Sequence, residues 1–303
     1  MKRILISGAT GLIGRHLVSY CNSEGYSVNF LTTDKSKIIS QYNNQGFYWN
    51  PAKGEIDTDC FKDVSVIINL AGAPIARRWS KAYKKEIINS RVQPIDLLKK
   101  SVEEGQFKIE QFISASAIGY YPDSDIKYYD EDYISEDTSF VVDVVRQWEA
   151  AADSFKKLDI PVAKIRIGLV LTKTGGALGK LVIPVKTFVG SSLGTGKQWQ
   201  SWIHIKDVVA IFMYIMKHKL EGTFNAVAPN PVTNKVLVRQ IAKVLKRPLL
   251  LPKAPTFILR LFLGEMHVLV TRGQRVSSRK IEDLGFHFNY YQLKSALEDL
   301  LKK

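Results

Sequence analysis

The chain has 303 residues, of which 46% are hydrophobic and 24% are charged, values typical of a globular protein with a large core. Its two cysteines are too few for a disulfide-stapled fold and suit a reducing compartment. The 43 lysine and arginine residues outnumber 29 acidic ones and give a net charge of +14, but they are scattered and no nucleic-acid-binding motif accompanies them. We therefore expect a basic surface that favours an anionic cofactor, and no nucleic-acid partner.

The sequence carries no export or membrane-spanning signal. Uninterrupted apolar stretches fall short of the ~18 residues that a membrane span needs. The first three residues lead directly into a short apolar run that glycines interrupt, unlike a signal peptide. These features predict a cytoplasmic protein without a membrane partner.

The opening segment carries the most informative motif. The apolar run Ile4-Leu5-Ile6 is followed by Gly8, Gly11 and Gly14, and then by apolar residues at helical spacing. The first glycine allows a sharp turn, the second allows backbone N–H groups to approach a pyrophosphate, and the third allows the helix to pack closely on the strand. A helix N-terminus attracts phosphate through its unpaired N–H groups and its dipole. We therefore predict a dinucleotide site at Gly8, Thr10, Gly11, Leu12, Ile13 and Gly14.

The residues after the next expected strand, Tyr26–Leu31, bear on the choice of nicotinamide cofactor. An acidic residue there hydrogen-bonds the ribose hydroxyls of NAD, whereas a cation accepts the additional phosphate of NADP. The sequence from Thr33 to Lys37 carries both signals, in Asp34 and in Lys35 and Lys37. Because Arg15 adds a cation beside the last glycine, we favour NADP, with NAD as the alternative.

Strand and helix patterns alternate along the following chain. This alternation predicts an α/β protein with a doubly wound parallel sheet of the Rossmann type over residues 1–228, including a substrate-side insert at about 174–200. Residues 229–303 are expected to form a smaller, mostly helical substrate-side part. The expected strands are Phe47–Trp49, Val64–Leu70, a strand beginning at Gln111, and Pro161–Ile167; the expected helices are Ser80–Glu104, Ser139–Leu158 and Leu178–Val189. Asp207 is expected to be the N-cap of a further helix.

Candidate site residues follow the ends of these strands, because doubly wound sheets bind ligands at their carboxyl edge. Ser116 and Tyr120 are candidates for contact with a substrate oxygen, the alternative being a loop serine beside a packed tyrosine. The remaining candidates divide into cofactor-binding residues, Leu70, Ala71, Gly72, Ser114 and Arg166, and substrate-binding residues, Arg77, Arg78, Trp79, Trp199 and Trp202. The arginine pair could hold an anionic substrate or form a solvated loop.

An apolar segment, Pro255–Val270, stands out near the C-terminus. Arg260, Gly264, Glu265 and His267 interrupt it, so it is too short to span a bilayer. We expect it to pack onto the main domain or onto a partner in a homodimer, in preference to lying at a membrane interface.

The motifs together resemble the extended and atypical short-chain dehydrogenase/reductases, in particular the NAD-dependent epimerase/dehydratase family. The resemblance covers essentially the whole chain and includes the branch known as epimerase family proteins. It is carried by Gly8–Gly14, Asn69–Gly72, Ser114–Ala117 and Trp202–Asp207, and for the branch by Arg77–Ser80, Trp148–Ala152, Asn230–Asn234 and Gly273–Val276.

The resemblance implies a fold more directly than a reaction. Members of the family use a Tyr-x-x-x-Lys pair for proton transfer, but Val145 and Glu149 stand at these positions here. Ser116 matches the family's substrate-binding serine, and Tyr120 is the nearest tyrosine that could substitute. Relatives often carry arginine where Thr33 stands, which weakens the NADP signal. The implied function is an NADP-dependent oxidoreductase or epimerase for a small, sugar-like or anionic substrate; the alternative is a dinucleotide-binding sensor or scaffold.

Overall fold

A mostly parallel sheet forms the centre of the molecule, as the computed structural model describes it over residues 3–41 and 43–302. The strand order is β13-β9-β7-β6-β1-β2-β4-β3, so the order reverses between β1 and β6. The predicted doubly wound fold is confirmed, and the reversal marks the point where such sheets bind ligands. The strands are β1 (Arg3–Ser7), β2 (Ser27–Thr32), β3 (Ser40–Gln41), β4 (Asn44–Asn50), β6 (Val64–Asn69), β7 (Gln111–Ala117), β9 (Val162–Ile167) and β13 (Gly222–Ala226), with β5 (Glu55–Ile56) paired to β4.

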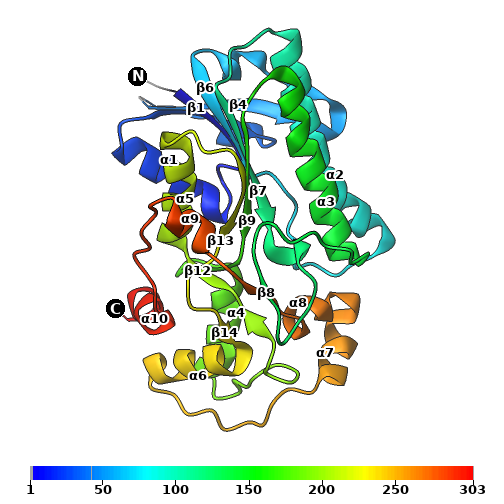
Figure 1. Cartoon of the computed structure of the whole chain (residues 1–303), viewed down its shortest axis with the longest axis vertical. Helices are drawn as coiled ribbons and strands as arrows, with labels where there is room; N and C mark the ends of the chain where they lie inside the picture. Colours follow the sequence, from blue (N-terminus) through cyan, green and yellow to red (C-terminus); the bar gives the residue numbers. More distant parts are fainter. Residues whose placement is uncertain (1–2, 42, 303) are drawn as a thin grey trace.

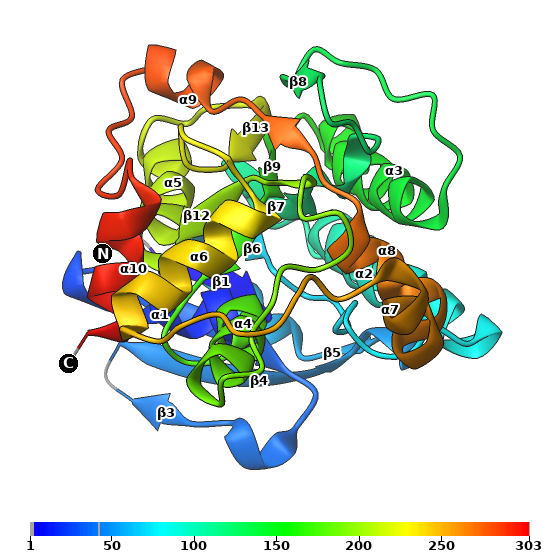
Figure 2. The same ribbon diagram turned by 90° about the horizontal axis from the view of Figure 1, so that it is seen from below.

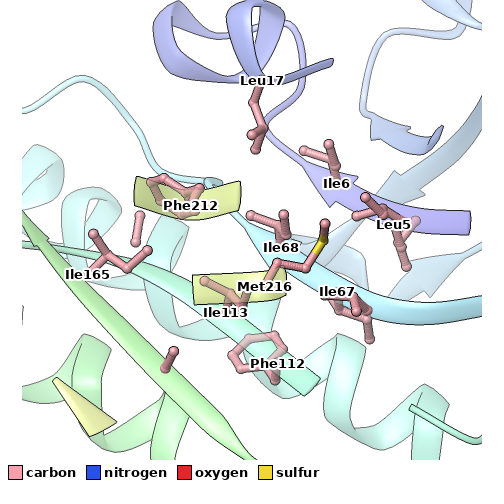
Figure 3. Close-up of a cluster of buried hydrophobic side chains, with 14 of the residues drawn as sticks. Leu5, Ile6, Leu17, Ile67, Ile68, Phe112, Ile113, Ile165, Phe212 and Met216 are labelled. Carbon is pink, nitrogen blue, oxygen red and sulfur yellow. The ribbon is translucent and has the colours of Figure 1, made fainter. Parts of the chain in front are cut away.

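Two pairs of helices cover the two faces of the sheet (Figure 1). Helices α1 (Leu12–Ser23) and α5 (Ile205–Lys217) pack against each other on one face, and α2 (Lys81–Glu104) and α3 (Phe140–Asp153) on the other. The central strands are therefore buried on both sides, which explains their continuous apolar runs. Figure 3 shows the resulting core, in which Leu17, Phe212 and Met216 from the helices point onto strand residues such as Ile68 and Ile113.

Smaller elements gather beyond the carboxyl ends of the strands (Figures 1 and 2). A second apolar cluster there combines residues on both sides of position 228, such as Leu178 and Trp202 with Leu237 and Leu297. The predicted domain division at that position stays a prediction. The elements are α4 (Gly176–Lys186), α6 (Asn234–Leu245), α7 (Thr256–Leu263), α8 (Val268–Thr271) and α10 (Leu293–Leu301), with the short strand pairs β10 (Leu169–Leu171) and β12 (Trp202–His204), β11 (Trp199–Gln200) and β14 (Val232–Thr233), and β8 (Tyr128–Tyr129) and β15 (Arg275–Val276). Helix α9 (Arg279–Asp283) lies beside β13 at the edge of the sheet.

The start of α5 differs from the sequence prediction. His204, not Asp207, is its N-cap, and the His204 Nδ1 atom accepts a hydrogen bond from the Lys206 N–H at 3.1 Å. Asp207 lies buried in the first turn, where its carboxylate accepts hydrogen bonds from the backbone N–H groups of Asn289 and Tyr290. It therefore ties the C-terminal segment to α5, a role that local capping preferences could not indicate.

His204 makes the stability of the fold depend on pH. Its ring is fully buried, stacks on Tyr290 with centroids 3.8 Å apart, and lies with Nε2 3.2 Å from Asp299 Oδ2. Burial lowers the pKa of His204 more than the nearby carboxylates raise it. The unfolded chain then binds a proton at this histidine before the folded chain does, so stability is lost as the pH falls below the ordinary histidine range near ~6.5.

We expect the unfolding temperature to fall between pH 7 and pH 5, and His204→Asn, which keeps a capping acceptor without a titration, to reduce that slope. Thermal unfolding at each pH, followed by circular dichroism, measures the unfolding temperature. The matched control is His218→Asn, since His218 is exposed. Identical slopes for the parent and the His204 variant would contradict the role of this group.

Among residues 3–41 and 43–302, no helix combines the length and the apolar character that crossing a membrane requires. In the same residues, no group of three or more His, Cys, Asp and Glu side chains forms a candidate metal site.

Candidate functional site

The glycine turn after β1 has the close packing that the sequence predicts. Gly8 has a φ of +69°, and a Cβ atom there would lie 2.7 Å from the Leu70 backbone. A Cβ atom on Gly14 would lie 2.2 Å from the Gly8 carbonyl oxygen, so these two positions exclude larger residues for structural reasons. Gly11 is different, because its Cβ would meet only the Gly8 oxygen, at 3.1 Å. It begins α1, and no described side chain caps the helix there.

A first cleft of about 720 Å³ opens beside this turn. It runs from Gly8 and Thr10 past the end of β2 to β4 and α2. Of the predicted cofactor residues, Gly8, Thr10, Thr33, Ala71 and Gly72 line it. The sequence analysis did not assign the α2 side chains that face it, Lys85, Glu86, Asn89 and Ser90, because their helix begins about ten residues after the strand motif that marks the site.

The predicted cations lie at different places around the first cleft. Lys37 lines the cleft, with its Nζ atom 3.3 Å from Asp34 Oδ2. Lys35 instead lies over the Tyr48 ring, 4.8 Å from its centroid. Arg15 donates hydrogen bonds to the backbone oxygen and hydroxyl of Thr174, which ties α1 to the segment before α4. Lys37 is therefore the cation of this group that the fold brings to the cleft.

A second cleft, of about 490 Å³, lies where β7, β9 and the C-terminal segment meet. Trp79 and Trp199 line it, as predicted for substrate-binding residues. Trp202 is instead fully buried in the second apolar cluster, and its indole N–H donates to the Asn230 oxygen at 2.9 Å. We therefore reassign Trp202 to the core. Arg77 and Arg78 are exposed, and the Arg77 guanidinium lies 4.9 Å from the Tyr83 ring centroid.

The loop after β6 borders both clefts and is anchored to α2. Ala73 lines the first cleft, and Trp79 the second. The Ala73 N–H donates to Ser90 Oγ at 2.9 Å, while Arg91 Nη2 donates to the Ala73 oxygen at 3.2 Å. The Arg91 guanidinium also lies 5.0 Å from the Trp148 ring centroid, and burial lowers its pKa to about 10. Arg91 thus fixes the loop between the clefts, a role that the sequence analysis did not assign.

A buried ion pair lies at the floor of this region, between α3 and β9. Arg166 makes two hydrogen bonds to Glu149, Nε to Oε1 at 2.8 Å and Nη2 to Oε2 at 2.9 Å. Ser116 Oγ donates to the same Oε1 at 2.6 Å. Although desolvation by itself lowers the pKa of Arg166, the hydrogen bonds and charge of Glu149 raise it above the usual range. The guanidinium therefore stays charged.

Two tyrosines complete this cluster. Arg166 Nη1 donates to Tyr121 Oη at 3.0 Å, and the tyrosine hydroxyl donates to Asn225 Oδ1 at 2.8 Å. Burial raises the pKa of Tyr121, so its hydroxyl remains protonated. The guanidinium also lies 3.6 Å from the ring centroid of Tyr120, whose hydroxyl accepts from the Ser135 N–H at 3.3 Å. Ser116, Glu149 and Arg166 thus form one hydrogen-bonded unit, which Arg166 connects to Tyr121 in the lining of the second cleft.

Comparisons with known proteins identify the fold and the family. The model of the NAD dependent epimerase/dehydratase family matches residues 4–140, and a domain of unknown function, DUF1731, matches residues 254–300. The chain is 36% identical to an epimerase family protein of Staphylococcus epidermidis over the full length of both chains. It is 37% identical to a chloroplastic epimerase family protein of Arabidopsis thaliana, with 99% of this chain and 86% of the relative covered. The chain belongs to the epimerase family.

A solved structure extends the similarity to three dimensions. The human epimerase family protein SDR39U1, crystallised with NADPH, is 28% identical to this chain, with a TM-score of 0.85 and 98% of each chain covered. UDP-glucuronic acid 4-epimerase of Bacillus cereus in complex with NAD shares the fold at a TM-score of 0.79 and 16% identity. The resemblance predicted from the sequence motifs is therefore confirmed.

Within this family, the position of Glu149 has a structural explanation. The sequence motifs predict that it stands at the position of the family's proton-transfer lysine, and in the structure Arg166 and Ser116 hold it by hydrogen bonds. Ser116 is only 3% exposed and commits its hydrogen to Glu149, and Ser114 is 1% exposed and donates to the Ala115 oxygen. Their hydroxyl groups are thus occupied within the protein. Leu70 is half-buried and packs against the main core.

Other titratable side chains line the second cleft, and sequence reasoning missed them. Asp123 and Asp137 lie in the segment after β7, and His267 and Arg272 flank α8. His267 Nδ1 lies 2.8 Å from the Gly264 oxygen, and because a carbonyl oxygen only accepts, Nδ1 is the donor. In the sequence His267 only interrupts an apolar segment, and no spacing relates it to β7 or β9.

Proposed function

We propose that this protein binds NADP(H) in the first cleft and uses it for hydride transfer to or from a small organic substrate in the second cleft. The observation that carries the proposal is the uncapped start of α1 at Gly11, beside a cleft that continues to the switch point of the sheet. The NADPH bound by the human relative supports the choice of cofactor. We also propose that the protein is located in the cytoplasm.

The residues present fit such a cofactor. Gly8, Thr10 and Gly11, with the N-terminal N–H groups of α1, would hold the pyrophosphate, and Thr33 and Lys37 would face the ribose and its phosphate. Ala71 and Gly72 are small enough to admit the dinucleotide past the end of β6. When bound, the nicotinamide would supply the hydride chemistry, while the protein supplies orientation and protons.

Proton transfer has to come from groups other than the usual pair. Tyr120 lacks the adjacent lysine and rests on the Arg166 guanidinium instead. His267 is a second candidate, because histidine exchanges protons near neutral pH and this side chain lines the second cleft. Turnover of ordinary sugar nucleotides is therefore expected to be slow or absent, even when the cofactor binds well.

We expect His267→Gln and Tyr120→Phe to separate these two candidates once a substrate is found. Loss of a general acid or base lowers kcat/KM by roughly 10²–10⁴-fold. Steady-state oxidation of NADPH, measured across a panel of small carbonyl compounds, provides the readout. Full activity in both variants would exclude both side chains as the proton-transfer group. Rapid epimerisation of sugar nucleotides by the parent would contradict the expectation that turnover of these substrates is slow.

Cofactor selectivity tests the assignment of Lys37. Because Lys37 lines the cleft and Lys35 lies over Tyr48, Lys37→Ala should weaken NADPH binding by about tenfold while leaving NADH binding nearly unchanged. The matched control, Lys35→Ala, should change both affinities little. Isothermal titration of the parent and both variants with each cofactor measures the six affinities. Equal affinity of the parent for NADPH and NADH would contradict the assignment.

A sensor or scaffold is the second candidate function, favoured by the sealed Glu149–Arg166 pair at the position of the usual catalytic lysine. Titrations with NADPH, NADH and duplex DNA, followed by the carbonyl panel, discriminate the alternatives. Tight NADPH binding with turnover supports the oxidoreductase, and tight binding without any turnover supports the sensor. Absence of NADPH binding would overturn both candidate functions. Tight, salt-resistant binding of duplex DNA would contradict the expectation that the protein has no nucleic-acid partner.

A further inference from the structure

The outer face of α7 exposes large apolar side chains. Phe257 is 72% exposed, and Leu261 and Phe262 are each 77% exposed. Leu250 and Leu251, in the connection from α6, add further exposed apolar area. Of the two packings that the sequence predicts, onto the main domain or onto a homodimer partner, this face does not show the first. We call Phe257, Leu261 and Phe262 the α7 patch; α7 lies at the periphery of the molecule (Figure 1). Globular proteins rarely leave such a contiguous apolar patch without a partner.

The sequence that leads into and through α7 is rich in cations. Between Glu221 and Glu265 the sequence contains seven lysine and arginine residues and no aspartate or glutamate. These cations are Lys235, Arg239, Lys243, Lys246, Arg247, Lys253 and Arg260. Lys246, Arg247, Lys253 and Arg260 are exposed, and Arg260 lies within α7 itself. The exposed apolar side chains therefore lie within a positively charged stretch.

We propose that the α7 patch docks on an anionic lipid surface, with the apolar side chains inserted at the level of the acyl chains and the flanking cations among the headgroups. Amphipathic segments that combine Phe and Leu with Lys and Arg bind membrane interfaces in this way. Arg260 has a long aliphatic stem, so its charge can reach the headgroups while its neighbours are inserted. The segment lies on the membrane and does not cross it.

Two observations favour lipid over other occupants. A second copy of the chain would bring the same stretch of cations against itself, and like charges oppose that contact. A protein partner that binds a helix usually does so through a groove that takes up one continuous apolar face of the helix. Here Phe257, Leu261 and Phe262 protrude from an eight-residue helix that is exposed on most sides.

The patch is held in place from both ends. Before α7, Ala254 exchanges backbone hydrogen bonds with the segment 192–194, Gly194 N–H to Ala254 O at 2.8 Å and Ala254 N–H to Ser192 O at 2.8 Å. After α7, Glu265 forms an ion pair with Lys84 of α2. The exposed side chains can therefore be replaced without removing these attachments.

The experiment is cosedimentation of the full chain with vesicles of phosphatidylcholine alone and with vesicles that contain phosphatidylglycerol. The test variant is Phe257→Ser with Leu261→Ser and Phe262→Ser. The matched control is Ile126→Ser with Ile134→Ser, since these side chains are 87% and 79% exposed on a different loop. A charge variant, Lys253→Gln with Arg260→Gln, tests the electrostatic part. Circular dichroism establishes that each variant folds.

We expect binding to the anionic vesicles only, reduced by about tenfold or more in the test variant and severalfold in the charge variant, and unchanged in the control. No binding of the parent to anionic vesicles would overturn the proposal. Equal binding of parent and test variant would also overturn it, since net charge alone would then explain the attraction. A concentration-dependent dimer that the test variant abolishes, without vesicle binding, would assign the patch to self-association instead.

Discussion

Glu149→Ala is expected to lower the free energy of unfolding by about 3–5 kcal/mol, because it leaves the buried Arg166 guanidinium without its counterion. Ser116 Oγ loses its acceptor in the same variant. Equilibrium unfolding in urea measures the change. The double variant Glu149→Leu with Arg166→Met, which removes both charges, should recover part of that loss.

A second ion pair of α3 provides the comparison. Asp153 pairs with Lys164 at 2.6 Å, but the Asp153 side chain is 34% exposed, so Asp153→Ala should cost only about 1 kcal/mol or less. A Glu149 variant as stable as the parent would mean that the pair contributes nothing to the fold.

Gly11→Leu is expected to weaken NADPH binding by about 100-fold or more, which corresponds to roughly 2.8 kcal/mol. The added side chain would occupy the approach of the pyrophosphate to the N-terminus of α1. The backbone at Gly11 has a φ of −75°, which any residue adopts, and a Cβ there meets only the Gly8 oxygen. The fold should therefore survive, so titration and thermal unfolding are measured on the same preparation.

Gly14→Ala is the contrasting variant. A Cβ at this position would overlap the Gly8 oxygen at 2.2 Å, so the expected result is a loss of stability of the whole strand, turn and helix unit. If Gly11→Leu binds NADPH as well as the parent does, the turn is not the cofactor site. If it unfolds as Gly14→Ala does, the separation between a binding glycine and a packing glycine is wrong.

Local patterns were sufficient to predict the framework. The expected strand at Val64–Leu70 is β6 (Val64–Asn69), and the expected helix at Ser80–Glu104 is α2, whose first turn Ser80 caps by accepting from the Tyr83 N–H. Both predictions rest on short stretches of sequence: a serine at a helix N-terminus caps the first turn, and a continuous apolar run is typical of a strand buried on both faces. The family resemblance likewise rests on short motifs, and the comparisons confirm it.

Predictions about side chains were less reliable where distant segments decide the surroundings. Trp199 and Trp202 are three residues apart, yet Trp202 is fully buried and Trp199 lines the second cleft. Lys35 and Lys37 are two residues apart, yet of these two Lys37 alone lines the first cleft. Neither difference follows from composition or spacing, since each depends on elements far away in the sequence.

The sequence by itself determined the glycine turn, the alternation of strands and helices, and the family, because each of these depends on neighbours along the chain. The resemblance also predicts that Glu149 stands at the position of the family's usual lysine, and this stays a prediction. Only the tertiary structure decided that Glu149 is bonded to Arg166 and Ser116, that His267 reaches the second cleft, and that α7 keeps its apolar face exposed. The physical reason is that burial and pairing are set by contacts between segments that lie 17 to more than 100 residues apart.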